Sequence, residues 1–423
     1  MTGASKKKTV WILNHYATLM YRNLGGRHYS LAKEMSRYGY DVVIFCASTI
    51  HNSSEEVEVA GKYRCERLGG VTYVFVKCRL YEGNGTSRIL NMIDYYRGVK
   101  KCADDFSRPD VIIGSSVHPL AQVAALQLAR RYRCKCIVET RDLWPASLEE
   151  YGVIKPGGII ARIMYRNERR CYEKADAVVF TIAGGVDYIR DKGWDVSHGG
   201  SINIEKVHYI NNGVDLEDFD NNRATIASSI AESSDETMAK LVYTGSVREA
   251  NGLGFLLDVA EDLREDRCEI VVVGSGDELE GLRSKAEKRE LGNIRFTGPI
   301  PKKEVPATLE GASLLLLLYS SSQAGLSRYG MSQNKLFDYL ASGKPILSNL
   351  PNRYSIVNEY ECGIERSFNS SKDFANQIRG MISDRDSMKR WGENARATAE
   401  LYSFASHASH LIDVIEEITK EEQ

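Results

Sequence analysis

The sequence has no long hydrophobic run. No uninterrupted stretch of apolar residues exceeds six, as at residues 314–319, whereas a membrane-spanning helix needs about 20. We therefore expect no transmembrane segment.

The sequence also lacks the cysteine spacing of a disulfide framework or a zinc site. Its nine cysteines are an odd number and include no C-x-x-C pair, and Cys134 and Cys136 have no second pair nearby. We expect reduced thiols and a cytoplasmic protein. No G-x-G-x-x-G with a downstream acid occurs, which argues against a dehydrogenase.

The composition is that of an ordinary globular protein. The chain has 423 residues, of which 43% are apolar and 26% charged, and this length fits two large domains or three smaller ones. Residues 1–200 hold 30 Lys and Arg against 21 Asp and Glu, while residues 201–423 hold 25 against 36. The asymmetry indicates that the first half meets an anionic partner, although it could also be accidental.

Short apolar runs rich in β-branched residues alternate with amphipathic stretches along the whole chain. This alternation predicts parallel sheets covered by helices, and hence two tandem Rossmann-like, doubly wound α/β domains with a cleft between them. We expect domains over residues 1–205 and 239–386, a linker over 206–238, and C-terminal helices over 387–423 that can pack back on the first domain. The strands are expected at 9–13, 41–47, 71–76, 110–115, 136–140, 177–182, 207–210, 240–244, 269–273, 294–297, 313–319 and 345–348.

Glycines follow three of the expected strands. Gly25 and Gly26 precede a helix, where backbone N–H groups can approach a phosphate or a sugar. Gly274 ends another strand, and Gly245 precedes Arg248, a plausible phosphate ligand. Each loop could equally be a tight turn, and Arg248 a solvated side chain.

The most informative segment is residues 329–346, in which a loop enters a helix with Ser332 as a candidate N-cap. Lys335 would lie in the first turn, where a positive charge opposes the helix dipole unless an anion binds there. Asp338 shares its face and could accept hydrogen bonds from ribose hydroxyls. The alternative is a surface ion pair between these two side chains.

This segment resembles the donor-site motif of family-4 retaining glycosyltransferases of the GT-B fold, in the subgroup with Ser-Pro-Asn-Lys-Leu-Phe-Asp-Tyr. Four further stretches resemble the same family, including an Arg-Asp-Leu-Trp-Pro signature of enzymes that build bacterial surface polysaccharides such as O-antigen and capsule. They are residues 25–29, 141–145, 212–215 and 243–252.

The resemblance implies an enzyme of the hexosyltransferase type (EC 2.4) that uses a nucleotide-diphosphate sugar, with a UDP-sugar favoured. The first domain would bind the acceptor and the second the donor. Catalytic roles fall on His118, which would face the donor sugar or the acceptor, and on Asp142, which could contact acceptor hydroxyls; each could instead be structural. The implied donor-binding residues are Gly25, Gly26, Gly245, Arg248, Gly274, Ser332, Asn334, Lys335 and Asp338.

The sequence departs from the family pattern at three places. Gln333 replaces the motif proline, Gly330 stands where the wider family has the first of two glutamates, and Asn251 replaces a phosphate-loop lysine. These changes place more of the expected diphosphate binding on Lys335 and Arg248.

We expect no metal and no other cofactor, because cations and helix N-termini can stabilise the departing diphosphate. The two Asp-x-Asp spacings, at residues 218–220 and 384–386, are read as accidental. A lipid-linked saccharide is the expected acceptor, and no nucleic acid is expected. Residues 88–101 and 159–174 predict basic amphipathic helices that could touch an anionic membrane from the cytoplasm, or simply cover the sheet.

Two other functions remain open from the sequence. A nucleotide-sugar epimerase of the same fold would need acid and base groups at the donor site and would act without an acceptor. A non-catalytic scaffold would keep the fold without binding nucleotides, as Gly330 and Asn251 allow.

Overall fold

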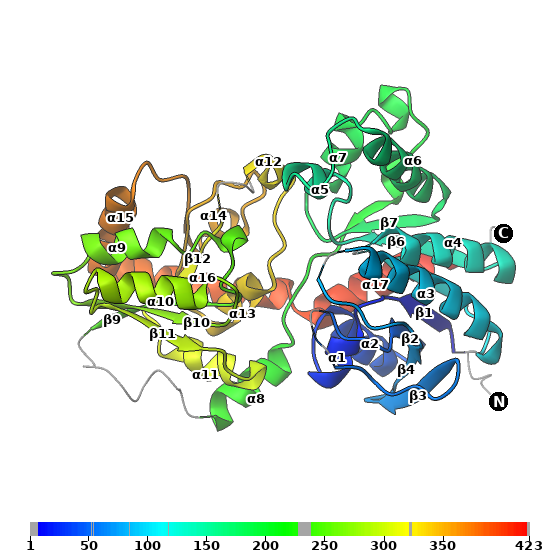
Figure 1. Ribbon diagram of the computed structural model, residues 1–423, viewed down its shortest axis with the longest axis horizontal. Helices are drawn as coiled ribbons and strands as arrows, with labels where there is room; N and C mark the ends of the chain where they lie inside the picture. The colour runs from blue at the N-terminus through cyan, green and yellow to red at the C-terminus, as the bar shows by residue number, and fades with distance from the viewer. Residues whose placement is uncertain are drawn as a thin grey trace. The chain divides into compact units, whose positions relative to one another are not determined.

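The computed structural model describes residues 7–51, 53, 55–83, 85–116, 118–226, 238–320 and 324–420. The chain divides into two compact α/β units (Figure 1). Unit 1 comprises Met1–Asn211 and Phe404–Gln423, and unit 2 comprises Asn212–Ser403.

Unit 1 is built on an eight-stranded sheet with the order β3-β4-β2-β1-β5-β6-β7-β8. All neighbours are parallel except β3 and β4. The strand order reverses between β1 and β5, and doubly wound sheets bind ligands beyond the carboxyl ends of such strands. The strands are β1 (Thr9–Leu13), β2 (Asp41–Ala47), β3 (Tyr63–Leu68), β4 (Val71–Val76), β5 (Val111–Ser115), β6 (Lys135–Thr140), β7 (Ala177–Phe180) and β8 (Val207–Tyr209).

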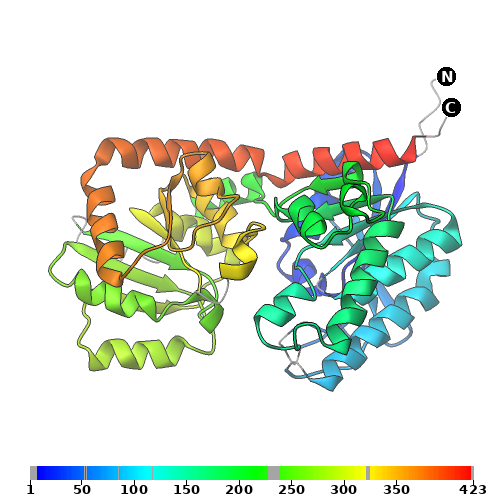
Figure 2. The ribbon, with the colours of Figure 1, turned by 90° about the horizontal axis from the view of Figure 1, so that it is seen from above.

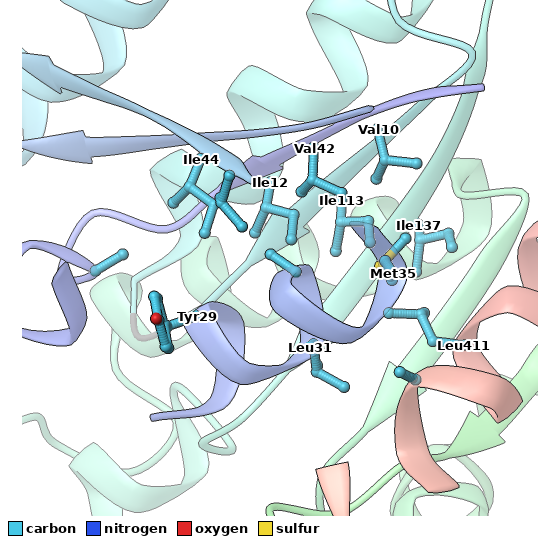
Figure 3. Packing of buried hydrophobic residues seen from close by; sticks show 14 of the residues in the cluster. Val10, Ile12, Tyr29, Leu31, Met35, Val42, Ile44, Ile113, Ile137 and Leu411 are labelled. Carbon is cyan, nitrogen blue, oxygen red and sulfur yellow. The ribbon is translucent and has the colours of Figure 1, made fainter. Parts of the chain in front are cut away.

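The helices of unit 1 include the last one of the chain, which packs against α2. They are α1 (Thr18–Arg22), α2 (Arg27–Arg37), α3 (Thr86–Cys102), α4 (Pro119–Tyr132), α5 (Ala146–Glu150), α6 (Ile159–Lys174), α7 (Gly185–Asp191) and α17 (Phe404–Thr419). Figure 3 shows side chains of the central strands, α2 and α17 gathered in one hydrophobic cluster. Each buried Val, Leu or Ile in such a cluster contributes about 1.5–3 kcal/mol to stability.

Unit 2 is built on a parallel six-stranded sheet with the order β11-β10-β9-β12-β13-β14. This is the order of a dinucleotide-binding doubly wound fold, with its reversal between β9 and β12. The strands are β9 (Ala239–Thr244), β10 (Cys268–Val273), β11 (Ile294–Gly298), β12 (Leu314–Leu317), β13 (Ile346–Ser348) and β14 (Gly363–Glu365).

Nine helices are described in unit 2, and the last of them leads directly to α17 of unit 1. Figure 2 shows α17 in red. The nine are α8 (Leu216–Thr225), α9 (Phe255–Asp262), α10 (Leu279–Lys288), α11 (Val305–Glu310), α12 (Ala324–Ser327), α13 (Asn334–Ser342), α14 (Ile356–Glu359), α15 (Ser371–Ser383) and α16 (Arg385–Leu401).

The two Rossmann-like sheets confirm the predicted fold class. The strands expected at residues 9–13, 41–47 and 71–76 have the predicted bounds, but β3 and β14 were not predicted. The range expected as a linker contains β8 and α8, and its residues 227–237 lie outside the described part of the chain.

Candidate active site

In unit 2, the loops that follow β9 and β10 lie backbone against backbone. The N–H of Gly245 donates to the carbonyl of Val273 at 2.9 Å. A Cβ placed on Gly274 would lie 1.7 Å from the Gly245 oxygen, and one on Gly276 2.0 Å from the Val247 oxygen. Gly274 and Gly276 are therefore required by the close approach of the two loops. The result is a glycine surface, made of main-chain atoms, beside the strand ends.

Helix α13 begins at Asn334, whose side chain is exposed, and it begins without a side-chain cap. The N-cap residue is Gln333, so the expectation that Ser332 caps this helix is wrong. Ser332 instead accepts a hydrogen bond at Oγ from Nδ2 of Asn212, at 3.0 Å. An uncapped helix N-terminus presents N–H groups and a positive dipole end to an anion.

Lys335 lies in the first turn of α13, as the sequence predicts, next to the glycine surface at Gly245. Its Nζ donates to the Tyr243 hydroxyl at 2.5 Å and lies 4.0 Å from the centre of that ring. A Cβ on Gly245 would be 3.0 Å from this Nζ. Burial lowers the pKa of Lys335 to about 7, and no carboxylate among the described residues forms an ion pair with it. A half-buried cation without an acidic partner is suited to an anionic ligand.

Arg248 and Asp338, which are also expected to bind the donor, and Asn251 of the phosphate loop have different surroundings. Arg248 is exposed after the β9 loop. Asp338 forms an ion pair with Lys302, at 3.1 Å. Asn251 donates to the carbonyl of Ser246 at 2.9 Å and thus holds the loop itself. The structure brings Gly245, Gly274 and Lys335 together, while Arg248 and Asp338 follow Gly245 and Lys335 by three residues in the sequence.

Gly330 adopts a φ of 98°. This backbone conformation favours glycine strongly over glutamate. The local geometry therefore accounts for the missing first glutamate at this position.

In unit 1, the glycine pair at the start of α2 is followed by a buried ionic network. Gly26 is the N-cap residue, with a φ of 105°. Arg27 Nη2 lies 2.6 Å from one oxygen of Glu139, and His28 Nε2 lies 2.8 Å from the other. Ser115 donates to the same carboxylate at 2.7 Å. Burial alone would raise the pKa of Glu139, but Arg27 and His28 together hold it well below its usual value.

His118 is buried and directly precedes α4. Its Nε2 lies 2.7 Å from Nδ1 of His15, and Nε2 of His15 lies 2.6 Å from Oδ1 of Asn91. Burial lowers the pKa of His118 well below its ordinary value and that of His15 to about 3, so both rings are neutral.

Asp142 follows β6 in an exposed position and lines a small recess that does not include His118. Desolvation by its surroundings raises the pKa of this carboxyl, although the side chain stays open to solvent. Glu168 lines the same recess and accepts hydrogen bonds from Tyr172 at 2.8 Å and Tyr188 at 2.9 Å. Burial raises the pKa of Glu168 to about 8, so the recess holds a neutral carboxyl at pH 7.

Comparison with known families gives two matches that together span most of the chain. Residues 25–200 match a glycosyl transferase 4-like domain, and residues 227–398 match the glycosyl transferases group 1. Each half of the chain thus matches a glycosyltransferase domain, and the two halves together have the fold of a GT-B glycosyltransferase. The matched segments fall largely in unit 1 and unit 2, respectively.

A curated relative of this glycosyltransferase is TuaH of Bacillus subtilis (strain 168), a protein assigned to teichuronic acid biosynthesis as a glycosyltransferase. The two chains are 26% identical over 225 residues. The match spans 53% of this chain and 53% of the relative, so it relates only about half of each protein.

Solved structures share the fold of this glycosyltransferase over nearly its whole length. A sucrose-phosphate synthase from Thermosynechococcus elongatus has a TM-score of 0.72 at 15% identity, covering 97% of this chain and 99% of its own. Anabaena HepE, solved in complex with UDP, has a TM-score of 0.65 at 13% identity, covering 97% and 100%. At these identities the likeness concerns the fold.

The two Asp-x-Asp spacings of this glycosyltransferase have structural partners. Asp220 forms an ion pair with Arg396 at 2.7 Å, and Asp384 accepts from the N–H of Ser387 at 3.0 Å at the start of α16. Among the described helices, none is long and apolar enough to cross a membrane.

Three residues of these networks, His15, Asn91 and Glu139, were not predicted from the sequence. A signal was present for His15, since it stands two residues after the end of β1, where ligands approach such a sheet. Asn91 and Glu139 carried no such signal, because their partners are distant in sequence.

Proposed function

We propose that the chain is a retaining, metal-independent glycosyltransferase that moves a sugar from a UDP-sugar to a lipid-linked or saccharide acceptor in cell-surface polysaccharide synthesis. The observation that carries the proposal is Lys335, a half-buried cation at an uncapped helix N-terminus beside the bare backbone of Gly245 and Gly274. This arrangement suits a diphosphate.

UDP is favoured as the nucleotide, and a surface polysaccharide as the product, by the relatives. HepE was solved with UDP and with UDP-glucose, and TuaH is assigned to teichuronic acid synthesis. The two basic side chains, Lys335 and Arg248, would hold the diphosphate, and Asp338 the ribose. In unit 1, His118 and Asp142 would contact sugar hydroxyls.

In the proposed reaction the bond between the anomeric carbon and the diphosphate breaks as the acceptor oxygen bonds to the same face of that carbon. The acceptor proton passes to a phosphate oxygen of the departing diphosphate. Lys335 and the N–H groups of α13 stabilise the negative charge that develops on this leaving group. The step needs no protein base.

A ligand screen tests the function. Thermal shift across UDP-, GDP-, ADP- and TDP-sugars should single out a UDP-sugar, and products formed with lipid-linked saccharides should keep the anomeric configuration of the donor. Epimerised sugar without an acceptor would favour an epimerase. Absence of binding to any nucleotide diphosphate would favour a scaffold.

Changing Asp338 to Asn should weaken UDP binding about tenfold, because a hydrogen bond to a charged acceptor contributes about 1.5–3 kcal/mol. Isothermal titration measures the effect. Lys302→Gln is the matched control, since it removes the ion pair of Asp338 but leaves the carboxylate in place. Equal losses in both variants would assign the effect to the ion pair and reject the ribose role.

Peripheral contact with an anionic membrane is part of the proposal, and α6 supports it better than α3. The stripe of α3 includes Met92 and Val99, which are buried. In α6, Ile159, Ile160 and Ile163 are 77%, 63% and 63% exposed. Helical spacing places basic side chains on the same outer face further along this helix, where they could meet acidic headgroups.

Changing Ile160 and Ile163 of α6 together to Ser should reduce binding to vesicles containing phosphatidylglycerol several-fold, because the apolar contact is lost. Cosedimentation at low and high salt measures it. The control is Ile89→Ser on α3, where the side chain is 55% exposed. If wild type and the double variant sediment equally, α6 is not the contact.

A further inference from the structure

Two histidines of unit 1 lie at the carboxyl ends of β1 and β5, where the strand order reverses. His15 follows β1 and His118 follows β5. Together with Asn91 of α3 they form one hydrogen-bonded chain, with 2.6 Å between Asn91 and His15 and 2.7 Å between His15 and His118. All three residues are buried.

The orientation of the Asn91 amide is fixed by its other bonds. Its Nδ2 lies 2.6 Å from the carbonyl oxygen of Arg79 and 3.1 Å from Oγ1 of Thr49. A carbonyl oxygen only accepts, so the nitrogen of Asn91 must face Arg79 and Oδ1 must face His15. Nε2 of His15 therefore carries a hydrogen and donates it to Asn91.

His15 has one ring hydrogen to place, because it is neutral. Its ring packs against those of Tyr16 and Tyr95, with centroids 4.6 and 4.7 Å away. Burial lowers its pKa to about 3, with smaller contributions from the nearby charges of Arg88 and His51 and against the hydrogen bond to Asn91, which favours the charged ring. With the hydrogen on Nε2, Nδ1 of His15 is an acceptor, and Nε2 of His118 must donate to it.

The remaining ring nitrogen of His118 is left as an acceptor. Within the described part of the chain, Nδ1 of His118 has no hydrogen-bond partner. A buried acceptor without a donor is costly, by about 1–3 kcal/mol. Burial, together with His15 and Arg88, keeps the pKa of His118 well below its ordinary value, so this nitrogen stays unprotonated.

We propose that Asn91 and His15 are positioning residues that fix the tautomer of His118, so that its Nδ1 accepts a hydrogen bond from a sugar hydroxyl of the substrate. The hydrogen bond from a sugar hydroxyl rests on the proposed function, whereas the tautomer does not. A neutral acceptor selects a hydroxyl and disfavours a phosphate or carboxylate oxygen, because those groups offer no hydrogen. It also leaves His118 outside the proton transfer.

Nitrogen NMR of the histidine rings tests the tautomer directly. The chain has eight histidines, and the signals of His118 are assigned as those that vanish in His118→Asn. In the wild-type protein at pH 7, His118 should show a protonated Nε2 and an unprotonated Nδ1. A hydrogen on Nδ1, or a charged ring, would overturn the proposal.

Two variants test whether the hydrogen-bonded chain from Asn91 through His15 to His118, here called the relay, sets the tautomer of His118, or whether any change in packing nearby would alter it. Asn91→Leu removes the acceptor for His15, so His15 can turn its hydrogen toward His118, and the tautomer of His118 should reverse or become mixed. Thr49→Val is the matched control, since the amide of Asn91 keeps its bond to Arg79. Thr49→Val should retain the wild-type tautomer. A folded Asn91→Leu protein with the wild-type tautomer would refute the relay.

Steady-state kinetics test the proposed hydrogen bond between His118 and a sugar hydroxyl. They use the UDP-sugar that the ligand screen identifies. Asn91→Leu should lower kcat/KM about tenfold, as expected for one lost hydrogen bond, while Thr49→Val stays within twofold and the Kd for UDP is unchanged in both. A rise in the donor KM assigns the hydroxyl to the donor sugar, and a rise in the acceptor KM assigns it to the acceptor. Unchanged constants despite a reversed tautomer would reject the substrate role. If no UDP-sugar is a donor, the proposed function fails while the NMR result on the relay still stands.

Discussion

Changing Lys335 to Ala should lower kcat/KM for sugar transfer about 100- to 1,000-fold, the loss seen when one donor to a developing negative charge is removed. UDP binding should weaken about tenfold, because a hydrogen bond between charged groups is lost. The variant should still fold, since the contacts of Lys335 Nζ with the described residues are limited to the hydroxyl and ring face of Tyr243 and the edge of the glycine loop.

Transfer assays and isothermal titration with UDP measure the effect, and thermal unfolding checks the fold. Lys288→Ala, at the exposed end of α10, is the control for loss of one lysine from the same unit. Wild-type kinetics for Lys335→Ala would remove this side chain from the site and with it the main support for the proposed function.

The pH dependence of UDP binding provides an independent measurement on the same lysine. The pKa of Lys335 is lowered to about 7 by burial, so the ammonium form is increasingly lost as the pH rises above 7. A bound diphosphate stabilises the ammonium form and raises its pKa. Between pH 7.5 and 9 the affinity for UDP should therefore fall, by at most about tenfold per pH unit. Lys335→Arg should abolish this slope, because arginine stays charged; a slope equal to the wild type would contradict the assignment.

Changing Glu139 to Gln should lower the free energy of unfolding by about 3–5 kcal/mol, because it leaves the buried Arg27 without its counter-charge. The carboxylate accepts from Arg27, His28 and Ser115, and Arg27 also donates to the carbonyl of Asn211. The loss of Glu139 therefore loosens the start of α2 and its glycine loop together.

Chemical denaturation followed by fluorescence measures this stability. Glu173→Gln is the control, because it breaks a half-exposed pair with Arg169 on α6, and exposed pairs contribute about 0–1 kcal/mol. If Glu139→Gln is no less stable than this control, the buried network does not stabilise unit 1.

Much of the fold could be predicted from the sequence because the central strands are continuous apolar runs. The edge strand β3 was missed since it consists of exposed and half-buried residues, including Arg64 and Glu66, and pairs in the described sheet with β4 alone. The strand β14 has three residues and no apolar run. Both strands form by pairing with a sheet that other parts of the chain build. A local sequence pattern does not contain that information.

The candidate site was predictable where its signal is local. Lys335 and the glycines after strand ends stand in short motifs, and the structure places Lys335 against Gly245. Of the partners of His118, His15 had a signal at a strand end, but Asn91 was not predictable, because it lies on α3, 76 residues from His15. The helix start was misplaced since Ser332 bonds to Asn212, 120 residues away, instead of capping α13.

The contact of Gly274 with the carbonyl of Gly245 has a consequence for engineering. No side chain can be introduced at Gly274 without separating the two loops, and a Cβ on Gly245, which has a φ of 134°, would lie 3.0 Å from Lys335, so a mutant library gains nothing from randomising either position. A change of sugar preference would have to come from neighbours with room for new atoms, such as the exposed Arg248 or Asn334. The positions that such a library must leave as glycine are thus set by main-chain packing rather than by the chemistry of sugar transfer.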